Sequence, residues 1–580
     1  MLSTTATSPS GQLQYGVTRP LSLASPTEKD LELTEALQKV LQAADFFESD
    51  EEGERREIVL GRLNQLVMRF VKQMAREKGY PEALVTETTG RIFTFGSYRL
   101  GVHSKGADID TLCVVPQHVE RGDFFTTFYG MLQEERDITE LTAVPEAYVP
   151  VLKMKISGIS IDLVFARLPV TSITDDVNLL DVNILKNLDE KCILSLNGSR
   201  TTDEILRLVP NIEAFHTTLR CIKLWAKRRG LYNNAMGYIA GVACAILTAR
   251  ICQLYPNASA AFLVSRFFHV YKQWPWPQPV YLKEIEDYAH LNMKIWNPRI
   301  NMVDRSHRMP LITPAYPSMC STHNVSASTL RMMQNEFDRG FQITTRVYNE
   351  GSPWDELFAP SDFFSRCFRY FIQVIAVSES EEKHRLWSGF IEAKLRQLVN
   401  KMELESDVDW APPYYEGFEG KPQDNLELVF QSHLYNPTAT TPTIPEGSPI
   451  VAPIVAEKED SNDKKEEEKK FYSTAFYLGI GIAKPDPATA SQRSGPRRLL
   501  LDRPISDFKL FVSNWDKVTP DMQVYVRDIK RQNLPVYIFP EDARPRAPIS
   551  RRGSVGENMN AVPEAVVESE LGKRTRSNNE

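Results

Sequence analysis

The stretch FGSYRLGVHSKGADIDTLCVV, from Phe95 to Val115, decides the fold. Its last residues, Thr111 to Val115, predict a strand, and Asp108 and Asp110 stand two residues apart where that strand begins. Side chains two apart in a strand point to the same face, so both carboxylates project together. Two anions this close repel each other unless a cation lies between them, which predicts a site for a hard divalent ion such as Mg²⁺. The alternative is an ordinary D-x-D pair on an exposed strand edge or turn.

A glycine and a serine precede this pair at a fixed spacing. Ten residues separate Gly96-Ser97 from Asp108. A glycine lets the backbone approach a phosphate, and the serine hydroxyl and nearby amides can bind the phosphate oxygens. The segment is not a Walker loop, because no G-K-[ST] follows the glycine.

A third carboxylate stands in GISIDLVFARL, residues 158–168. Apolar and other residues alternate there, which predicts a strand with Asp162 on one face. An aspartate in so apolar a strand needs a partner, either backbone donors and Arg167 or a metal ion on a neighbouring strand. Three such carboxylates could hold two Mg²⁺ ions about 4 Å apart.

Composition bounds the class of protein. The chain has 580 residues, 42% hydrophobic and 25% charged, which is typical of a globular protein of several domains. The net charge of −7 means that any nucleic-acid site must be a local basic surface. The seven cysteines form no C-x-x-C pair, so a reducing compartment is expected. We expect no membrane or secretory role, since no apolar stretch is long enough to span a bilayer.

The pattern of elements changes along the chain. Residues 1–28 are expected to be extended, and Leu31 to Met74 helical with an acidic interruption around Asp50 to Glu54. Short strands are expected over 91–165, and long helices over 211–355.

The C-terminal part predicts a βαββαβ order, the ferredoxin-like arrangement of RNA-recognition modules. Its helix has the apolar face Trp387, Ile391, Leu395, Leu398 and Met402, and a second helix follows Pro504. The four strands are expected at Phe368–Val377, Leu426–Leu434, Tyr472–Ile482 and Pro535–Phe539.

The motifs together carry a family resemblance. G-S-x10-D-x-D with a later strand aspartate resembles the polymerase-β-type nucleotidyltransferases. FGSYRLGVHSKGADIDTL, NLDEKCILSLNGSR, IKLWAKRRGLYNNAMGYIAGV and DRSHRMPLITPAYPSMCSTHN resemble the eukaryotic, fungal-like nuclear poly(A) polymerases. The likeness is dense from Tyr15 to Met402.

The resemblance implies an α+β fold of three domains: a polymerase-β-like palm, a helical central domain and a ferredoxin/RRM-like C-terminal domain. The expected bounds are an N-terminal tail and helix at 1–55, the nucleotidyltransferase domain at 56–209, the central domain at 210–360 and the RNA-binding domain at 361–540. A disordered insertion is expected at 437–470, where a Pro/Thr-rich run is followed by the charged run EKEDSNDKKEEEKK at 457–470, and a disordered basic tail is expected at 541–580.

The resemblance also implies roles for single residues. Asp108, Asp110 and Asp162 match the metal-binding catalytic triad. The ATP-binding set would comprise these three with Phe95, Gly96, Ser97, Lys223, Tyr232, Asn234, Gly241 and Val242. The RNA-binding set would comprise Lys153, Asn197, His323 and Lys394.

Two patterns near these positions have ordinary alternatives. Arg220, Lys223 and Lys227 form one basic stripe of a helix over 213–229, and such a stripe is more often a solvated face. Gly237 and Gly241 stand at a spacing that normally indicates close helix packing, although it also leaves room for a flat base.

The implied activity is template-independent transfer of AMP from ATP to the 3′-hydroxyl of RNA, as in mRNA polyadenylation, with two Mg²⁺ ions, or Mn²⁺, per site. The implied partners are ATP, single-stranded RNA 3′ ends and subunits of a cleavage and polyadenylation complex. The implied state is a monomer outside that complex, located in the nucleus. The rivals are a uridylyltransferase or CCA-adding enzyme with the same carboxylates, and a catalytically silent RNA-binding scaffold.

Overall fold

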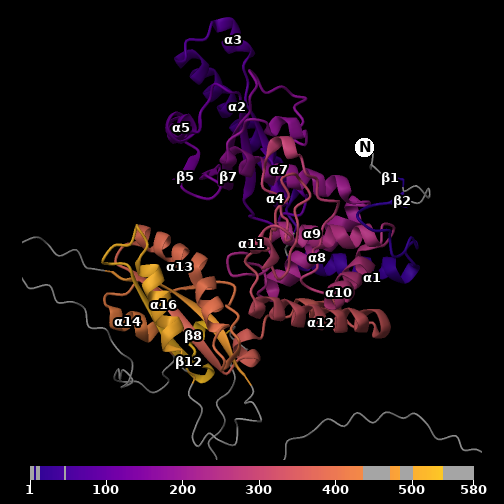
Figure 1. Ribbon diagram of the computed structural model, residues 1–580, viewed down its shortest axis with the longest axis vertical. Helices are drawn as coiled ribbons and strands as arrows, with labels where there is room; N and C mark the ends of the chain where they lie inside the picture. The colour runs from indigo at the N-terminus through magenta and orange to yellow at the C-terminus, as the bar shows by residue number, and fades with distance from the viewer. Residues whose placement is uncertain are drawn as a thin grey trace, which may run out of the picture.

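The computed structural model describes residues 6–7, 13–44, 47–434, 470–483, 499 and 501–539. Figure 1 shows three bodies: one around β5, β7 and α2, one around α8, α9, α10 and α12, and one around β8, β12 and α13. The insertion expected at 437–470, except Lys470, and the tail expected at 541–580 lie outside the described residues. Within the described ranges no helix is both long and apolar enough to cross a membrane.

A five-stranded sheet forms the centre of the first body. The order is β3-β4-β7-β6-β5, and β4 pairs with β7 in parallel while the other pairs are antiparallel. The strands are β3 (Arg91–Thr94), β4 (Ile109–Val115), β5 (Ile138–Val144), β6 (Val151–Ile156) and β7 (Ile159–Arg167). The strands predicted at 111–115 and within 158–168 are therefore confirmed.

Helices cover this sheet. The apolar side of α2, with Leu63, Val67 and Phe70, belongs to the same buried core as the central strands. The helical elements of this body are α2 (Asp50–Glu77), α3 (Glu82–Glu87), α4 (Gly96–Arg99), α5 (Arg121–Asp123), η1 (Phe124–Phe128), α6 (Tyr129–Gln133), η2 (Val182–Leu185) and α7 (Glu190–Leu208).

The helical stretch expected over 31–74 is interrupted, as predicted, but the break lies between Ala43, where one helix ends, and Asp50, where α2 begins. The acidic run at residues 50–54 is the first turn of α2 and not the interruption itself. Ser49 caps α2, and its side chain and that of Glu52 exchange hydrogen bonds with each other's backbone N–H. Acidic side chains are favourable in the first turn, where the helix dipole is positive.

The second body is helical, as predicted. In its core Trp225 of α8 stacks on Phe337 of α12 and meets Phe267 of α10 edge-on. Its elements are α1 (Glu28–Ala43), α8 (Ile212–Arg228), α9 (Gly241–Leu254), α10 (Ala260–Gln273), η3 (Ala289–Leu291), α11 (Met302–Arg305), α12 (Ala327–Glu350) and η4 (Trp354–Phe358). The N-terminal segment runs along it, because the Leu21 N–H donates to the Leu254 carbonyl at 2.8 Å. Two short strands, β1 (Ala6–Thr7) and β2 (Leu13–Gln14), precede this segment.

The third body combines a sheet with helices, as expected, but its order is β8-α13-β9-β10-α14-β11-α16-β12 and not the predicted βαββαβ, and its sheet runs β10-β11-β8-β12 with β9 paired to β11. The predicted apolar face of α13 is confirmed, since Trp387, Ile391 and Leu395 are buried with Leu398 and Met402. Its elements are η5 (Phe363–Cys367), β8 (Tyr370–Ser378), α13 (Glu381–Met402), β9 (Val408–Trp410), β10 (Phe418–Glu419), α14 (Leu426–Ser432), β11 (Tyr472–Ile482), α16 (Asp502–Ser513), β12 (Gln523–Lys530), η6 (Arg531–Asn533) and η7 (Val536–Ile538).

Two of the four predicted strands are wrong. Leu426–Leu434 is mostly the helix α14, which Asn425 caps by accepting a hydrogen bond from the Leu428 N–H. Pro535–Phe539 contains the short helix η7. Short apolar runs do not distinguish a strand from a helix by periodicity alone. The strands that take these places, β10 and β12, are respectively very short and partly charged.

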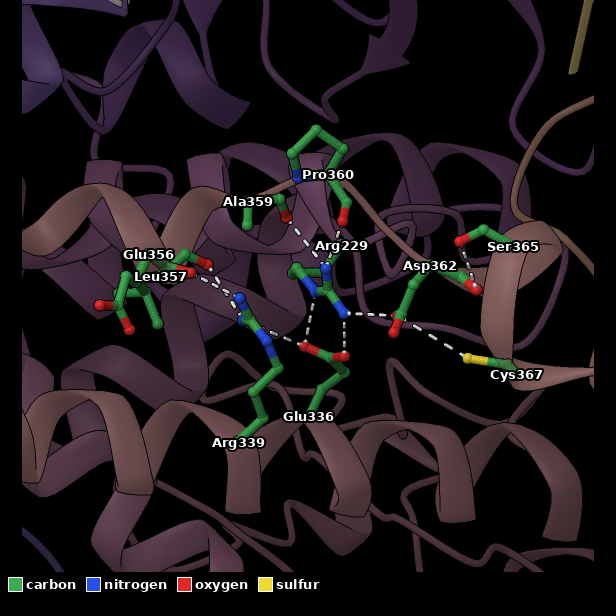
Figure 2. A network of polar contacts seen from close by, with 10 residues as sticks. All are labelled: Arg229, Glu336, Arg339, Glu356, Leu357, Ala359, Pro360, Asp362, Ser365 and Cys367. Carbon is green, nitrogen blue, oxygen red and sulfur yellow. Dashed lines mark hydrogen bonds and ion pairs between the residues drawn. The ribbon is translucent and has the colours of Figure 1, made fainter. Parts of the chain in front are cut away.

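A buried ion pair lies at the joint between the second and third bodies (Figure 2). The guanidinium of Arg229, at the end of α8, donates to both carboxylate oxygens of Glu336 on α12 at 2.7 and 2.9 Å. It also donates to the carbonyls of Ala359 and Pro360 and to the carboxylate of Asp362, at 2.9, 2.5 and 3.1 Å. One cation therefore ties two helices of the central body to the segment that leads into the C-terminal body.

Glu336→Ala should destabilise the protein strongly, because it removes the bidentate partner of the buried Arg229 charge and leaves only the more exposed Asp362 carboxylate as an ionic partner. The side chains of Arg229 and Glu336 are only 5% and 11% exposed. Breaking a buried pair from one side costs about 3–5 kcal/mol, which predicts a fall of roughly 10 °C in the thermal midpoint. Calorimetry measures this, with Glu82→Ala as the control, because its pair with Arg76 is exposed on both sides. Equal midpoints in the two variants would contradict the prediction.

Candidate active site

Strand pairing brings three aspartates together. The parallel register of β4 and β7 sets Asp110 beside Asp162, and Asp108 directly precedes β4. One carboxylate oxygen of each of the three lies within 4.8 Å of those of the other two. Asp108 is exposed, and Asp110 and Asp162 are partly buried. The donor set consists of carboxylate oxygens, which suits a hard divalent ion.

The crowding of negative charge perturbs one of these groups. Burial, together with the neighbouring carboxylates of Asp108 and Asp162, raises the pKa of Asp110 to about 7. Lys153 and Lys223 act in the opposite direction, because their positive charges favour the ionised carboxylate. The triad thus holds more negative charge than its surroundings neutralise.

Lys153 lies directly against the triad. It is the antiparallel partner of Asp162 across β6 and β7, and its Nζ donates to Asp162 Oδ2 at 2.5 Å. The family resemblance associated Lys153 with RNA binding, and no periodic pattern in the sequence predicted its ion pair with Asp162.

The turn at Gly96-Ser97 lies against Asp110 of the triad. Gly96 has φ +63°, and a Cβ built on it would lie 2.1 Å from Asp110 Oδ2. The Phe95 N–H donates to the Asp110 carbonyl at 3.0 Å, and the Gly96 N–H donates to the Thr202 hydroxyl at 3.2 Å. The turn is therefore fixed to β4 on one side and to α7 on the other, with Ser97 in the first turn of α4. Sequence reasoning gave no sign of Thr202.

Lys223 is buried, which excludes a solvated face for this member of the basic stripe. Its Nζ donates to the Val102 carbonyl at 2.8 Å, in the loop between Ser97 and Asp108. Burial lowers the pKa of Lys223 to about 8, and the nearby positive charge of Lys227 contributes. Arg220 of the same stripe donates to the carbonyl of Gly101 in the same loop.

Tyr232 and Gly241 meet at the start of α9. A Cβ on Gly241 would lie 3.3 Å from the Tyr232 hydroxyl, and the next residue, Val242, is 38% exposed. Burial raises the pKa of the Tyr232 hydroxyl well above its usual range, and the negative charges of Asp110 and Asp108 contribute. Tyr232 therefore lies at the start of α9 and close enough to the triad to feel its charge.

Asn234 and Gly237 lie in the loop between α8 and α9. The Asn234 Oδ1 is buried and has no hydrogen-bond partner among the residues that the structure describes, and the Asn234 backbone carbonyl accepts from Asn324 Nδ2 at 3.1 Å. Gly237 precedes α9 and has φ +86°, so its spacing to Gly241 does not mark packing along one helix.

The residues assigned to RNA come from all three bodies. Asn197 lies on α7, and its buried Oδ1 has no hydrogen-bond partner within the described part of the chain. His323 is exposed before α12, and Lys394 lies on α13 with its ammonium 5.3 Å from the Phe390 ring centre. Of these four residues, Lys153 alone has a hydrogen bond to the triad in the part of the chain that the structure describes.

Known proteins match the chain over nearly its whole length. Family models described as the poly(A) polymerase nucleotidyltransferase, central and predicted RNA binding domains match residues 16–209, 214–360 and 362–547. Poly(A) polymerase PAPa of Candida albicans is 40% identical over 94% of this chain and 96% of its own length. A poly(A) polymerase of Dictyostelium discoideum is 41% identical over 93% of this chain, which spans only 61% of that relative. A solved structure of an RNA terminal uridylyl transferase is 16% identical, with a TM-score of 0.39, and covers 57% of this chain and 99% of its own.

Gly96→Ala should abolish the activity of the site, because the added Cβ would displace the Asp110 carboxylate. Gly106→Ala is the matched control, since Gly106 has φ +69° but no atom within 4 Å of the built Cβ. Both variants carry the same backbone strain of roughly 1 kcal/mol, and only the first has the steric contact. RNA primer extension should fall at least about a hundredfold for Gly96→Ala alone, if the carboxylate holds the reacting groups. Equal activity in the two variants would overturn this reading of the turn.

Proposed function

The chain belongs to the poly(A) polymerase family, and we propose how its own residues carry out template-independent transfer of AMP from ATP to the 3′-hydroxyl of RNA. The observation that carries the assignment is the triad of Asp108, Asp110 and Asp162, with oxygens within 4.8 Å of one another, beside the turn at Gly96. A phosphate chain bound by that turn would have its α-phosphate next to the three carboxylates.

The triad suits divalent ions, and we assign it two Mg²⁺ ions, with Mn²⁺ as the alternative. Asp108 and Asp110 would hold both ions, and Asp162 would hold the one nearer the RNA. Two such ions, when bound, lower the pKa of an attacking hydroxyl and stabilise charge on a leaving pyrophosphate. Lys153 fixes the orientation of the Asp162 carboxylate through its ion pair. Asp162 is then positioned to accept the proton of the RNA 3′-hydroxyl.

The ATP triphosphate would lie between the turn and α8. The Ser97 hydroxyl and the Lys223 ammonium supply hydrogen-bond donors to its oxygens, and Lys223 offsets its negative charge. Phe95 packs against Gly198, where a Cβ would approach its ring to 2.8 Å, and so supports the turn from α7.

The adenosine would lie against Tyr232, Gly241 and Val242 at the exposed start of α9. The buried Oδ1 of Asn234 has no partner among the described residues and is free to accept a hydrogen bond. An amino group such as that on C6 of adenine supplies the donor, and uracil has none there. This favours ATP over UTP.

The RNA strand would approach across Asn197, His323 and Lys394, which lie on three different bodies, with Lys153 next to the reacting end. Positive charge and stacking bind single-stranded RNA without sequence preference. We assign the enzyme to the nucleus, as a monomer that joins subunits of a cleavage and polyadenylation complex. The domain bounds proposed above, 56–209, 210–360 and 361–540, go with this assignment.

A labelled single-stranded RNA primer, given each NTP separately in Mg²⁺, should be extended with ATP alone. Asp108→Ala/Asp110→Ala should abolish the ladder, because both shared ion ligands are lost. Asp424→Ala, at an exposed aspartate before α14, is the control and should extend the primer normally. Gel electrophoresis reads the products.

Other outcomes would point to the rivals. A ladder with UTP or CTP would keep the triad mechanism and overturn the choice of base. RNA binding without any ladder would favour the silent scaffold.

Affinity for ATP should weaken as the pH rises from 7 to 9. The pKa of Lys223 is lowered to about 8, so the ammonium that faces the triphosphate is present below that pH and lost above it. At pH 9, one unit above this pKa, only about a tenth of the Lys223 side chains remain charged, so the KM for ATP should rise by up to about tenfold. Lys223→Arg keeps its charge over this range, so its KM should change much less. Parallel KM profiles in the two proteins would contradict this role for Lys223.

A further inference from the structure

The loop between α8 and α9, residues 229–240, is held from the C-terminal body. Asn233 lies between Tyr232 and Asn234 in this loop, and its Nδ2 donates to Glu392 Oε1 at 2.9 Å and to the Tyr415 carbonyl at 2.7 Å. Glu392 belongs to α13 and Tyr415 to the segment between β9 and β10. Both amide hydrogens of Asn233 are therefore used by the other body.

The same side chain also shapes the loop. The Oδ1 of Asn233 accepts from the Met236 N–H at 3.2 Å, and the Asn233 carbonyl accepts from the Tyr238 N–H at 3.0 Å. Asn233 thus joins the internal turn of the loop to α13.

A second link reaches Asn234 itself. Asn324 Nδ2 donates to the Asn234 carbonyl at 3.1 Å, and Asn324 Oδ1 accepts a hydrogen bond from Arg396 Nη1. Arg396 and Glu392 are four residues apart on α13, so they face the loop from one side of the helix. Lys394, assigned above to RNA, lies in the same turn of α13.

Glycines at both ends of the loop are packed against these partners. Gly230 has φ +72°, and a Cβ there would lie 3.0 Å from the Tyr415 ring. Gly237 has φ +86°, and a Cβ there would lie 2.7 Å from the Asn324 carbonyl oxygen. The loop therefore has its conformation set where it touches Tyr415 and Asn324.

Docking of the two bodies does not depend on these contacts alone. Arg331 of α12 pairs with Asp409 of β9 at 2.8 Å, and Glu403 accepts from the Ser328 N–H at 2.7 Å. The Arg229 network of Figure 2 adds a third joint. The first two of these joints do not reach the loop, and the third reaches only its first residue, Arg229, whereas the hydrogen bonds of Asn233 and of Asn324 end on Asn233 and Asn234 beside Tyr232.

We propose that Glu392 and Arg396 are positioning residues for the nucleotide pocket: through Asn233 and Asn324 they hold Tyr232 and Asn234 in the conformation that binds ATP. The C-terminal body thereby sets ATP affinity, in addition to contacting RNA. The proposal rests on the proposed function, in which Tyr232 and Asn234 contact ATP.

Asn324→Asp removes the hydrogen bond to the Asn234 carbonyl without weakening the contact with Arg396. The aspartate keeps an oxygen for Arg396 and strengthens that contact by its charge, but it replaces the donor to the Asn234 carbonyl by a repelling oxygen. Glu392→Ala removes the acceptor of Asn233, and Glu392→Gln retains one. Asp409→Asn is the matched control, because it weakens a joint between the same two bodies that does not reach the loop.

The full-length protein and each variant would be compared in three measurements: primer extension for KM and kcat, calorimetric binding of α,β-methylene ATP, and RNA binding without nucleotide. Asn324→Asp and Glu392→Ala should each weaken ATP binding about five- to tenfold, the effect of one or two lost hydrogen bonds. kcat and RNA affinity should change less than about twofold. Glu392→Gln should restore most of the ATP affinity.

Two results would overturn the proposal: ATP affinity in Asn324→Asp and Glu392→Ala no weaker than in Asp409→Asn, or a loss that appears in thermal stability and RNA affinity as much as in ATP affinity. Failure of the proposed function would look different. It would show in the wild-type protein, as primer extension that does not require ATP or that survives loss of Asp108 and Asp110.

Discussion

Repulsion among three carboxylates is the constraint on which the rest of this structure depends. The oxygens of Asp108, Asp110 and Asp162 lie within 4.8 Å of one another, and the pKa of Asp110 rises to about 7 through burial and the charges of the other two. Lys153 contacts Asp162 directly and Lys223 acts from further away. Two monovalent cations do not balance a crowded triad that is to remain ionised, so the site favours additional positive charge. Divalent ions supply this charge in a small volume.

Strand register, set by backbone pairing and by burial of the apolar side chains on the other face of the sheet, keeps the carboxylates in this costly arrangement. The parallel register of β4 and β7 sets Asp110 beside Asp162, and the antiparallel register of β6 and β7 sets Lys153 opposite Asp162. A slip of one residue would turn these side chains to the other face of the sheet. The buried apolar residues that alternate with Asp162, such as Ile161 and Leu163, oppose that slip because it would expose them.

The parts that sequence could predict are those with a local pattern. Alternation around Asp162 predicted β7, and the spacing from Gly96 to Asp108 predicted the turn beside the triad. Strands were wrong at 426–434 and 535–539, where short apolar runs fit a helix equally well, and the strands that replace them, β10 and β12, are brief or partly charged. Lys153 was expected to bind RNA, but its pairing with Asp162 was not predicted, because it depends on strand register, which no local pattern encodes.

Sequence patterns predict even less of the contacts that hold the loop at residues 229–240. Asn233 and Glu392 are 159 residues apart, and neither the Y-N-N run nor the apolar face of α13 shows that they meet. The side chains of the triad, which motifs predicted, lie where the proposed chemistry restricts the residue type. The residues that hold the loop, such as Asn233 and Glu392, are ordinary polar residues, and any matching pair of donor and acceptor would make the same contact. Their roles are therefore specific to the folded arrangement of the chain, because the same residues at the same spacing would have no partner if α13 packed elsewhere.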